Sequence, residues 1–152
     1  MSRTDESSRL IAADPQTIYD AMSNPEALAT WLPPAGMHGE MIDFALRPGG
    51  HYKMILRHDD VSIAGKSDGN EDIAMARFVE LVPGKLIVLH IDFPSDDPAF
   101  AGTMVMHWKL DDAAGGTLVT IRAENVPQGI SASDHAEGLS SSLENLAEFV
   151  ER

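Results

Sequence analysis

Two histidines are the side chains of this chain best suited to acid–base chemistry. His90 falls within an expected strand, and His135 falls in the first turn of an expected long helix. Because an imidazole titrates near neutrality, either ring could act as a general acid or base, or orient a ligand oxygen. Each could equally be a core histidine that is hydrogen-bonded to the backbone. The residues themselves leave both interpretations open.

Metal and nucleophile patterns are incomplete. The histidines show neither His-x-His nor His-x-x-x-His spacing; they stand at positions 38, 51, 58, 90, 107 and 135. A calcium pattern that starts at Asp68 fails at Ile73 and Val79, where a glycine and a bidentate glutamate are needed. A serine stands at Ser133 where a nucleophile elbow requires glycine. We expect a solvated loop over 59–72, no metal, no cofactor and no complete catalytic set.

Composition narrows the class of protein. The 152 residues suit one domain, 1–152, that is large enough to fold without disulfides, and there are no cysteines. Lys and Arg number 11 against 24 Asp and Glu, and the formal net charge of -13 would repel nucleic acid and anionic membranes. Neither a signal pattern nor an apolar run of membrane-spanning length is evident. We expect a soluble, cytoplasmic protein.

Three helices are expected. Asp14-Pro15 and Asn24-Pro25 each combine an N-cap residue with a proline at the first helical position, and each predicts a short helix. A long helix is expected over 131–152, with cap-type side chains at Ser131, Ser133 and Asp134 and a capping box from Asp134 to Glu137. Its apolar stripe recurs at helical spacing, at His135, Leu139, Leu143, Leu146 and Val150.

The remaining chain predicts strands joined by short turns. A possible edge strand covers 9–13, and further strands cover 40–46, 52–57, 73–82, 86–93, 103–110 and 118–124. Short connections favour an antiparallel sheet, so the fold class is α+β, with a sheet that curls around the last helix. Alternation places one set of side chains inward, namely Met104, Met106, Trp108 and Leu110. A cavity between sheet and helix would suit a small ligand.

Six short motifs, in this order along the chain, carry a resemblance to a known family. They are Ala12-Ala13-Asp14-Pro15, the run from Asn24 to Trp31, the run from Leu46 to Tyr52, the run from Arg77 to Pro83, Gly115-Gly116-Thr117, and the two runs His135–Leu139 and Leu143–Leu146. Together they resemble the activator of heat-shock-protein-ninety ATPase homologue family, within the START-like (SRPBCC) superfamily. The resemblance implies the helix-grip fold, in which a curved antiparallel sheet wraps around a long C-terminal helix.

The resemblance also implies which side chains face the helix. On the strand 86–93 it places Leu86, Val88 and His90 inward, and on the strand 52–57 it places Tyr52, Met54 and Leu56 inward. The expected cavity lining is Trp31, Tyr52, Met54, Phe78, His90, Met106, Trp108, His135 and Leu139. Eight methionines suit an adaptable pocket, although ordinary core packing would explain them too. His90 and His135 are expected to share this cavity.

Three functions remain open at this stage. The first is a non-catalytic module that binds a small apolar or amphipathic ligand between the sheet and the last helix. The second is a chaperone accessory protein, which the family name implies. The third is an enzyme of the cyclase or dehydratase type found in the superfamily, with His90 and His135 as acid and base. Fold analogy supports all three functions, so the residues and geometry of the site are needed to distinguish them. The sequence leaves the ligand and the oligomeric state open.

Overall fold

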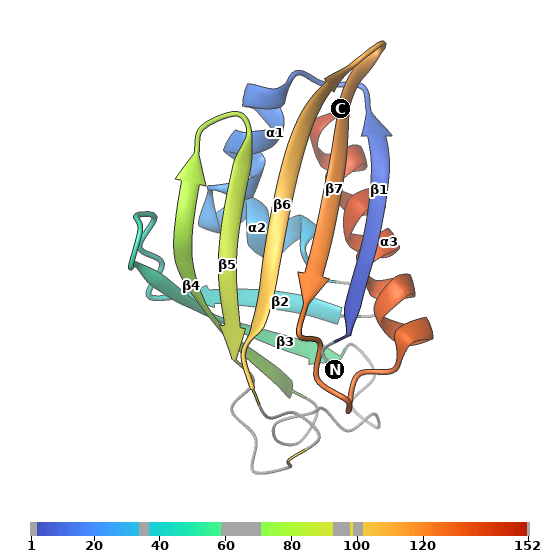
Figure 1. The fold of residues 1–152 in the computed structure, drawn as a ribbon. Helices are drawn as coiled ribbons and strands as arrows, with labels where there is room; N and C mark the ends of the chain where they lie inside the picture. The colour runs from blue at the N-terminus through green and yellow to red at the C-terminus, as the bar shows by residue number, and fades with distance from the viewer. Residues whose placement is uncertain (1–2, 34–36, 59–70, 93–97, 99–101, 152) are drawn as a thin grey trace.

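A computed structural model describes residues 3–33, 37–58, 71–92, 98 and 102–151 (Figure 1). The loop expected over 59–72 therefore lies almost wholly outside the described residues. The elements run, in chain order, β1 (Thr4–Ile11), α1 (Pro15–Met22), α2 (Pro25–Trp31), β2 (Met37–Ile42), β3 (His51–His58), β4 (Glu71–Val82), β5 (Leu86–Asp92), β6 (Met104–Ala113), β7 (Gly116–Glu124) and α3 (Ala132–Val150).

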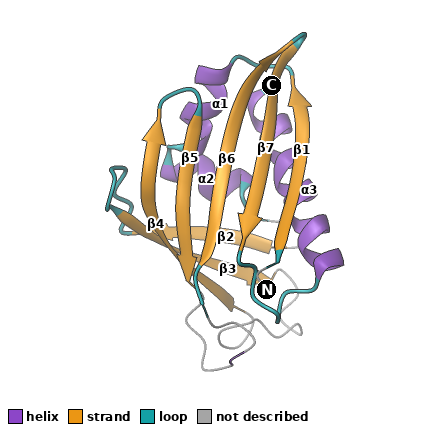
Figure 2. Ribbon diagram, in the orientation of Figure 1, coloured by secondary structure: helices purple, strands orange, loops and turns teal. Residues whose placement is uncertain are grey.

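The strands form one antiparallel sheet in the order β1-β7-β6-β5-β4-β3-β2. The sheet is strongly curved, since β2 and β3 run across the lower ends of β5 to β7 in Figure 1. All three helices cover the same face of the sheet, with α3 along the β1 side (Figure 2). The predicted α+β class and helix-grip fold are confirmed, and the apolar core lies between the curved sheet and the helices.

The two short helices begin where the sequence predicts. The Asp14 side chain accepts a hydrogen bond from the Thr17 backbone N–H at 2.7 Å. The Asn24 side chain accepts from two backbone N–H groups, of Glu26 at 2.9 Å and of Ala27 at 3.0 Å. Such caps satisfy donors that a helix cannot pair internally, so both helices have defined starts.

The long helix begins three residues earlier than the predicted capping box requires. Ser131 is its N-cap, and the Ser131 hydroxyl accepts from the Asp134 backbone N–H at 3.1 Å. Asp134 therefore already lies in the first turn, where its negative charge suits the positive end of the helix dipole. The capping box from Asp134 to Glu137 was wrong, whereas the buried stripe at Leu139, Leu143 and Leu146 is confirmed.

Alternation assigns the faces of β6 correctly. All four residues predicted to point inward are buried in the core: Met104, Met106, Trp108 and Leu110.

Strand β5 has the opposite parity to the one expected. Residues directly opposite each other on antiparallel strands share a face, and Leu89 pairs with inward-facing Met106. The core residues of β5 are consequently Ile87, Leu89 and Ile91. The expectation that Leu86, Val88 and His90 point toward the helix was wrong, because their partners on β6 lie on the outer face.

Among the described residues, no helix combines the length and apolar character that crossing a membrane requires.

Candidate functional site

A cavity of about 180 Å³ lies between the inner face of the sheet and α3. Strands β3 to β7, the residue after α2, and α3 all contribute to its wall. The lining residues are Leu32, Tyr52, Met54, Leu56, Ala74, Ile91, Met104, Met106, Trp108, Ile121, His135, Gly138, Leu139 and Ser142. The wall is predominantly apolar, so the interior favours a ligand with little exposed polarity.

Six of the nine predicted lining residues meet at this cavity, namely Tyr52, Met54, Met106, Trp108, His135 and Leu139. Two others lie in the packed core and do not line it. The Trp31 indole N–H donates to the Ala21 backbone carbonyl at 2.9 Å, and the ring meets Trp108 edge to face at 5.9 Å between centroids. Phe78 packs against the rings of Phe44 and Tyr52.

His90 lies on the other face of the sheet. Its Nδ1 accepts a hydrogen bond at 3.0 Å from the guanidinium of Arg77, the residue opposite it on β4. A guanidinium can only donate, so this contact leaves the proton of the neutral ring on Nε2. The hypothesis that His90 and His135 share a cavity was wrong, and with it the acid–base pair that they would have formed.

His135 meets the cavity from α3 and is held from outside by Asp5 on β1. The His135 Nδ1–H donates to a carboxylate oxygen of Asp5 at 2.6 Å, and both side chains are nearly buried, at 12% and 13% exposure. Arg3 donates to the same carboxylate oxygen at 3.0 Å. Burial alone raises the pKa of Asp5, but the hydrogen bonds from His135 and Arg3 outweigh it and keep the pKa below its usual 3.8. The carboxylate is thus ionised and orients the imidazole.

Other polar groups border the cavity. The Ser142 hydroxyl donates to the Leu32 backbone carbonyl at 2.9 Å, so it is already paired. Burial raises the pKa of the Tyr52 hydroxyl, which therefore stays a neutral phenol. The buried Trp108 Nε1–H has no hydrogen-bond partner within the described part of the chain.

Sequence reasoning missed Asp5. The run from Thr4 to Ser8 is polar and shows no apolar alternation, so it was not predicted as strand, and the expected edge strand began only at Arg9; in the structure the run pairs with β7 throughout. In the structure, polar residues of β1 face polar residues of α3. The Ser7 and Ser140 hydroxyls lie 3.4 Å apart, in the same strand–helix contact as Asp5 and His135.

The described residues contain no group of three or more His, Asp or Glu side chains placed to hold a metal ion.

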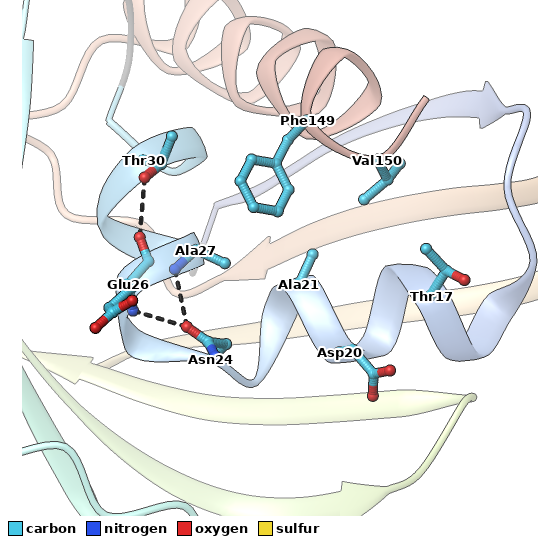
Figure 3. A pocket seen from close by; sticks show the side chains of 9 residues that line it. All are labelled: Thr17, Asp20, Ala21, Asn24, Glu26, Ala27, Thr30, Phe149 and Val150. Atoms are coloured by element: carbon cyan, nitrogen blue, oxygen red, sulfur yellow. Dashed lines mark hydrogen bonds between the residues drawn. The ribbon is translucent and has the colours of Figure 1, made fainter. Parts of the chain in front are cut away.

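A larger groove of about 550 Å³ lies on the surface between α1, α2 and the last turn of α3 (Figure 3). Phe149 points into it from α3, and its polar groups serve the helices themselves. The Asn24 side chain caps α2, Thr30 donates to the Glu26 carbonyl at 2.9 Å, and Asp20 accepts from Gln16 at 2.8 Å. We therefore regard the internal cavity as the candidate site.

The comparison with protein families agrees with this architecture. The model of the family described as "Activator of Hsp90 ATPase homolog 1-like protein" matches residues 12–151. The chain belongs to this family. Among curated proteins, none matches the chain.

Solved structures extend the family assignment. A crystal structure of a protein from Chromobacterium violaceum is 32% identical, with 98% of this chain and 97% of that chain covered and a TM-score of 0.87. A Mesorhizobium loti protein is 18% identical over 99% and 98% of the two chains, with a TM-score of 0.77. An Arthrobacter aurescens protein is 14% identical over 97% and 86%, with a TM-score of 0.80. The last two show the shared fold alone.

Proposed function

We propose that this member of the activator of Hsp90 ATPase homolog 1-like family binds a small apolar molecule between its sheet and α3. The cavity of about 180 Å³, with its mostly apolar wall, is the observation that supports this function. Transfer of an apolar ligand from water into this cavity would remove its apolar surface from water and add dispersion contacts with the cavity wall.

The size of the cavity limits the ligand. An engineered protein cavity of about 150 Å³ lined by apolar side chains binds benzene. A cavity of about 180 Å³ should therefore accept a single substituted ring or a short aliphatic chain. Met54, Met104 and Met106 line it and are flexible enough to fit several shapes.

Gly138 offers a way to fill the cavity without disturbing the fold. It lies within α3 and lines the cavity, and a Cβ placed on it would meet nothing within 4 Å beyond its own helix. Gly138→Leu would occupy the ligand volume. Gly138→Ala is the matched control, since it changes the backbone in the same way but adds only a methyl group.

Toluene is a suitable first probe, titrated into the protein while amide and methyl NMR signals are followed. We expect saturable binding by the wild type and by Gly138→Ala, and at least tenfold weaker binding by Gly138→Leu. Native mass spectrometry of freshly purified protein adds an independent readout, because a ligand retained by the wild type should be missing from Gly138→Leu. Equal toluene affinity in all three proteins, or none in the wild type, would contradict the proposal.

The family match over residues 12–151 favours a second candidate, an accessory role at the chaperone's ATPase. A stable complex with the chaperone that survives Gly138→Leu would support that role independently of the cavity.

A further inference from the structure

One ring nitrogen of His135, Nε2, is available to hydrogen-bond a ligand. A carboxylate only accepts, so the contact with Asp5 fixes the proton of the neutral ring on Nδ1. His135 is one of the residues that line the cavity, and no described residue is hydrogen-bonded to its Nε2. In the neutral ring Nε2 is an acceptor, and in the protonated ring it is a donor.

Several contacts hold the Asp5–His135 pair in this geometry. Asp5 is held in place by Arg3 at 3.0 Å, and it bridges the edge strand β1 to the first turn of α3. Both partners of the pair are nearly buried, so the ring has little freedom to turn its free nitrogen away. An orienting carboxylate behind a histidine is the arrangement by which proteins fix the tautomer and direction of an imidazole.

We propose that the ligand carries a hydroxyl group, which hydrogen-bonds His135 Nε2 at the edge of a mostly apolar cavity. This inference rests on the proposed function. A hydroxyl both donates and accepts, so it matches His135 in either protonation form. It adds only one heavy atom to a ring that the cavity can hold.

The inferred class is therefore small phenols and alcohols. Hydrocarbons of the same size would leave His135 Nε2 facing apolar atoms, which costs the hydrogen bonds that it makes with water. Carboxylates would place an anion near ionised Asp5 within a poorly solvated space.

The test compares toluene, 4-methylphenol and 4-methylbenzoate, which share one ring and differ in the polar group. Titrations followed by NMR and calorimetry would use the wild type, His135→Leu, Asp5→Asn and His90→Leu. The last variant makes the same substitution on the opposite face of the sheet. The quantity of interest is the ratio of the toluene and 4-methylphenol dissociation constants.

In the wild type and in His90→Leu, 4-methylphenol should bind at least tenfold more tightly than toluene. In His135→Leu the preference should fall by about tenfold while toluene still binds, and in Asp5→Asn it should be intermediate because the ring is no longer fixed. An equal ratio in the wild type and His135→Leu, or tightest binding of 4-methylbenzoate, would overturn the inference and leave the proposed function standing. Failure of all three compounds to bind the wild type would overturn both.

Discussion

At the residue scale, the structure separates two histidines that the sequence made equivalent. His135 could be placed on the cavity because helical spacing ties it to Leu139 and Leu143 on one face. His90 could not be placed reliably, since one residue of register reverses the face of every side chain on a strand. Asp5 was out of reach, because nothing local marks a partner that is 130 residues away.

Asp5→Asn should lower the free energy of unfolding at pH 7 by up to about 1.5–3 kcal/mol, the usual value of a hydrogen bond to a charged group. The pKa of Asp5 is lower in the folded protein than its usual value of 3.8. Ionised Asp5 therefore stabilises the fold at pH values above 3.8, and this stabilisation is lost as the pH falls through the folded-state pKa. The wild type should therefore lose more stability than Asp5→Asn between pH 5 and pH 3. Urea unfolding across this range measures it, with exposed Asp112→Asn as control. Parallel profiles for the wild type and Asp5→Asn would show that the pair is not formed.

His90→Ala should leave toluene binding unchanged and alter stability by no more than about 1 kcal/mol. The ring lies on the outer face and its contact with Arg77 is exposed, where such pairs contribute little. Chemical denaturation and the toluene titration together check this. A tenfold loss of affinity would mean that the β5 register is different.

At the element scale, caps and spacing were better predictors than strand faces. The Asp-Pro and Asn-Pro pairs mark the start of a helix by their own side-chain and backbone properties, and both predicted starts are confirmed. Which side chains of β5 face the core is decided by the register of its pairing with β6, and this register depends on both strands. The start of β1 escaped prediction for a related reason: its polar residues are held by pairing with β7 and by contacts to α3.

The stripe of α3 should carry much of the stability of the sheet–helix contact. Leu143 and Leu146 are buried, and truncation of such a leucine typically costs about 2–5 kcal/mol. Leu143→Ala and Leu146→Ala should each fall in this range by urea denaturation. Exposed Glu144→Ala, between them in sequence, should stay within about 0.5 kcal/mol of the wild type. Similar losses for all three variants would indicate general damage to the helix rather than a buried face.

Gly138 lets the same helix be stabilised. Glycine within a helix costs about 0.5–1 kcal/mol relative to alanine, and the site has room for a Cβ. Gly138→Ala should thus raise the free energy of unfolding by about that amount in urea titrations. A decrease would mean that the space beside Gly138 is occupied.

At the scale of the whole molecule, the order of elements predicted the helix-grip fold, because one long amphipathic helix after a run of strands has few ways to bury its stripe. That a cavity would remain could also be anticipated from this geometry. Its volume could not, since it depends on how Tyr52, Trp108 and the methionines interdigitate.

The net charge of -13 acts on the molecule as a whole. Self-repulsion destabilises a compact state, and salt screens it. Raising NaCl from about 20 to 300 mM should raise the Tm, by about 2–4 °C for each 1 kcal/mol of relief in a protein of this size. Chloride is preferable to sulfate, which strengthens apolar burial by itself. A Tm that falls with NaCl would show that attractive charge pairs outweigh the repulsion.

The edge-to-face contact between Trp31 and Trp108 gives the protein an internal optical signal. These are its two tryptophans, both are buried, and one of them forms part of the cavity wall. A molecule that enters the cavity changes the surroundings of Trp108 directly and those of Trp31 through the shared ring contact. Near-ultraviolet circular dichroism and tryptophan emission of the unlabelled protein should therefore report whether the space beneath the sheet is filled, without any introduced dye.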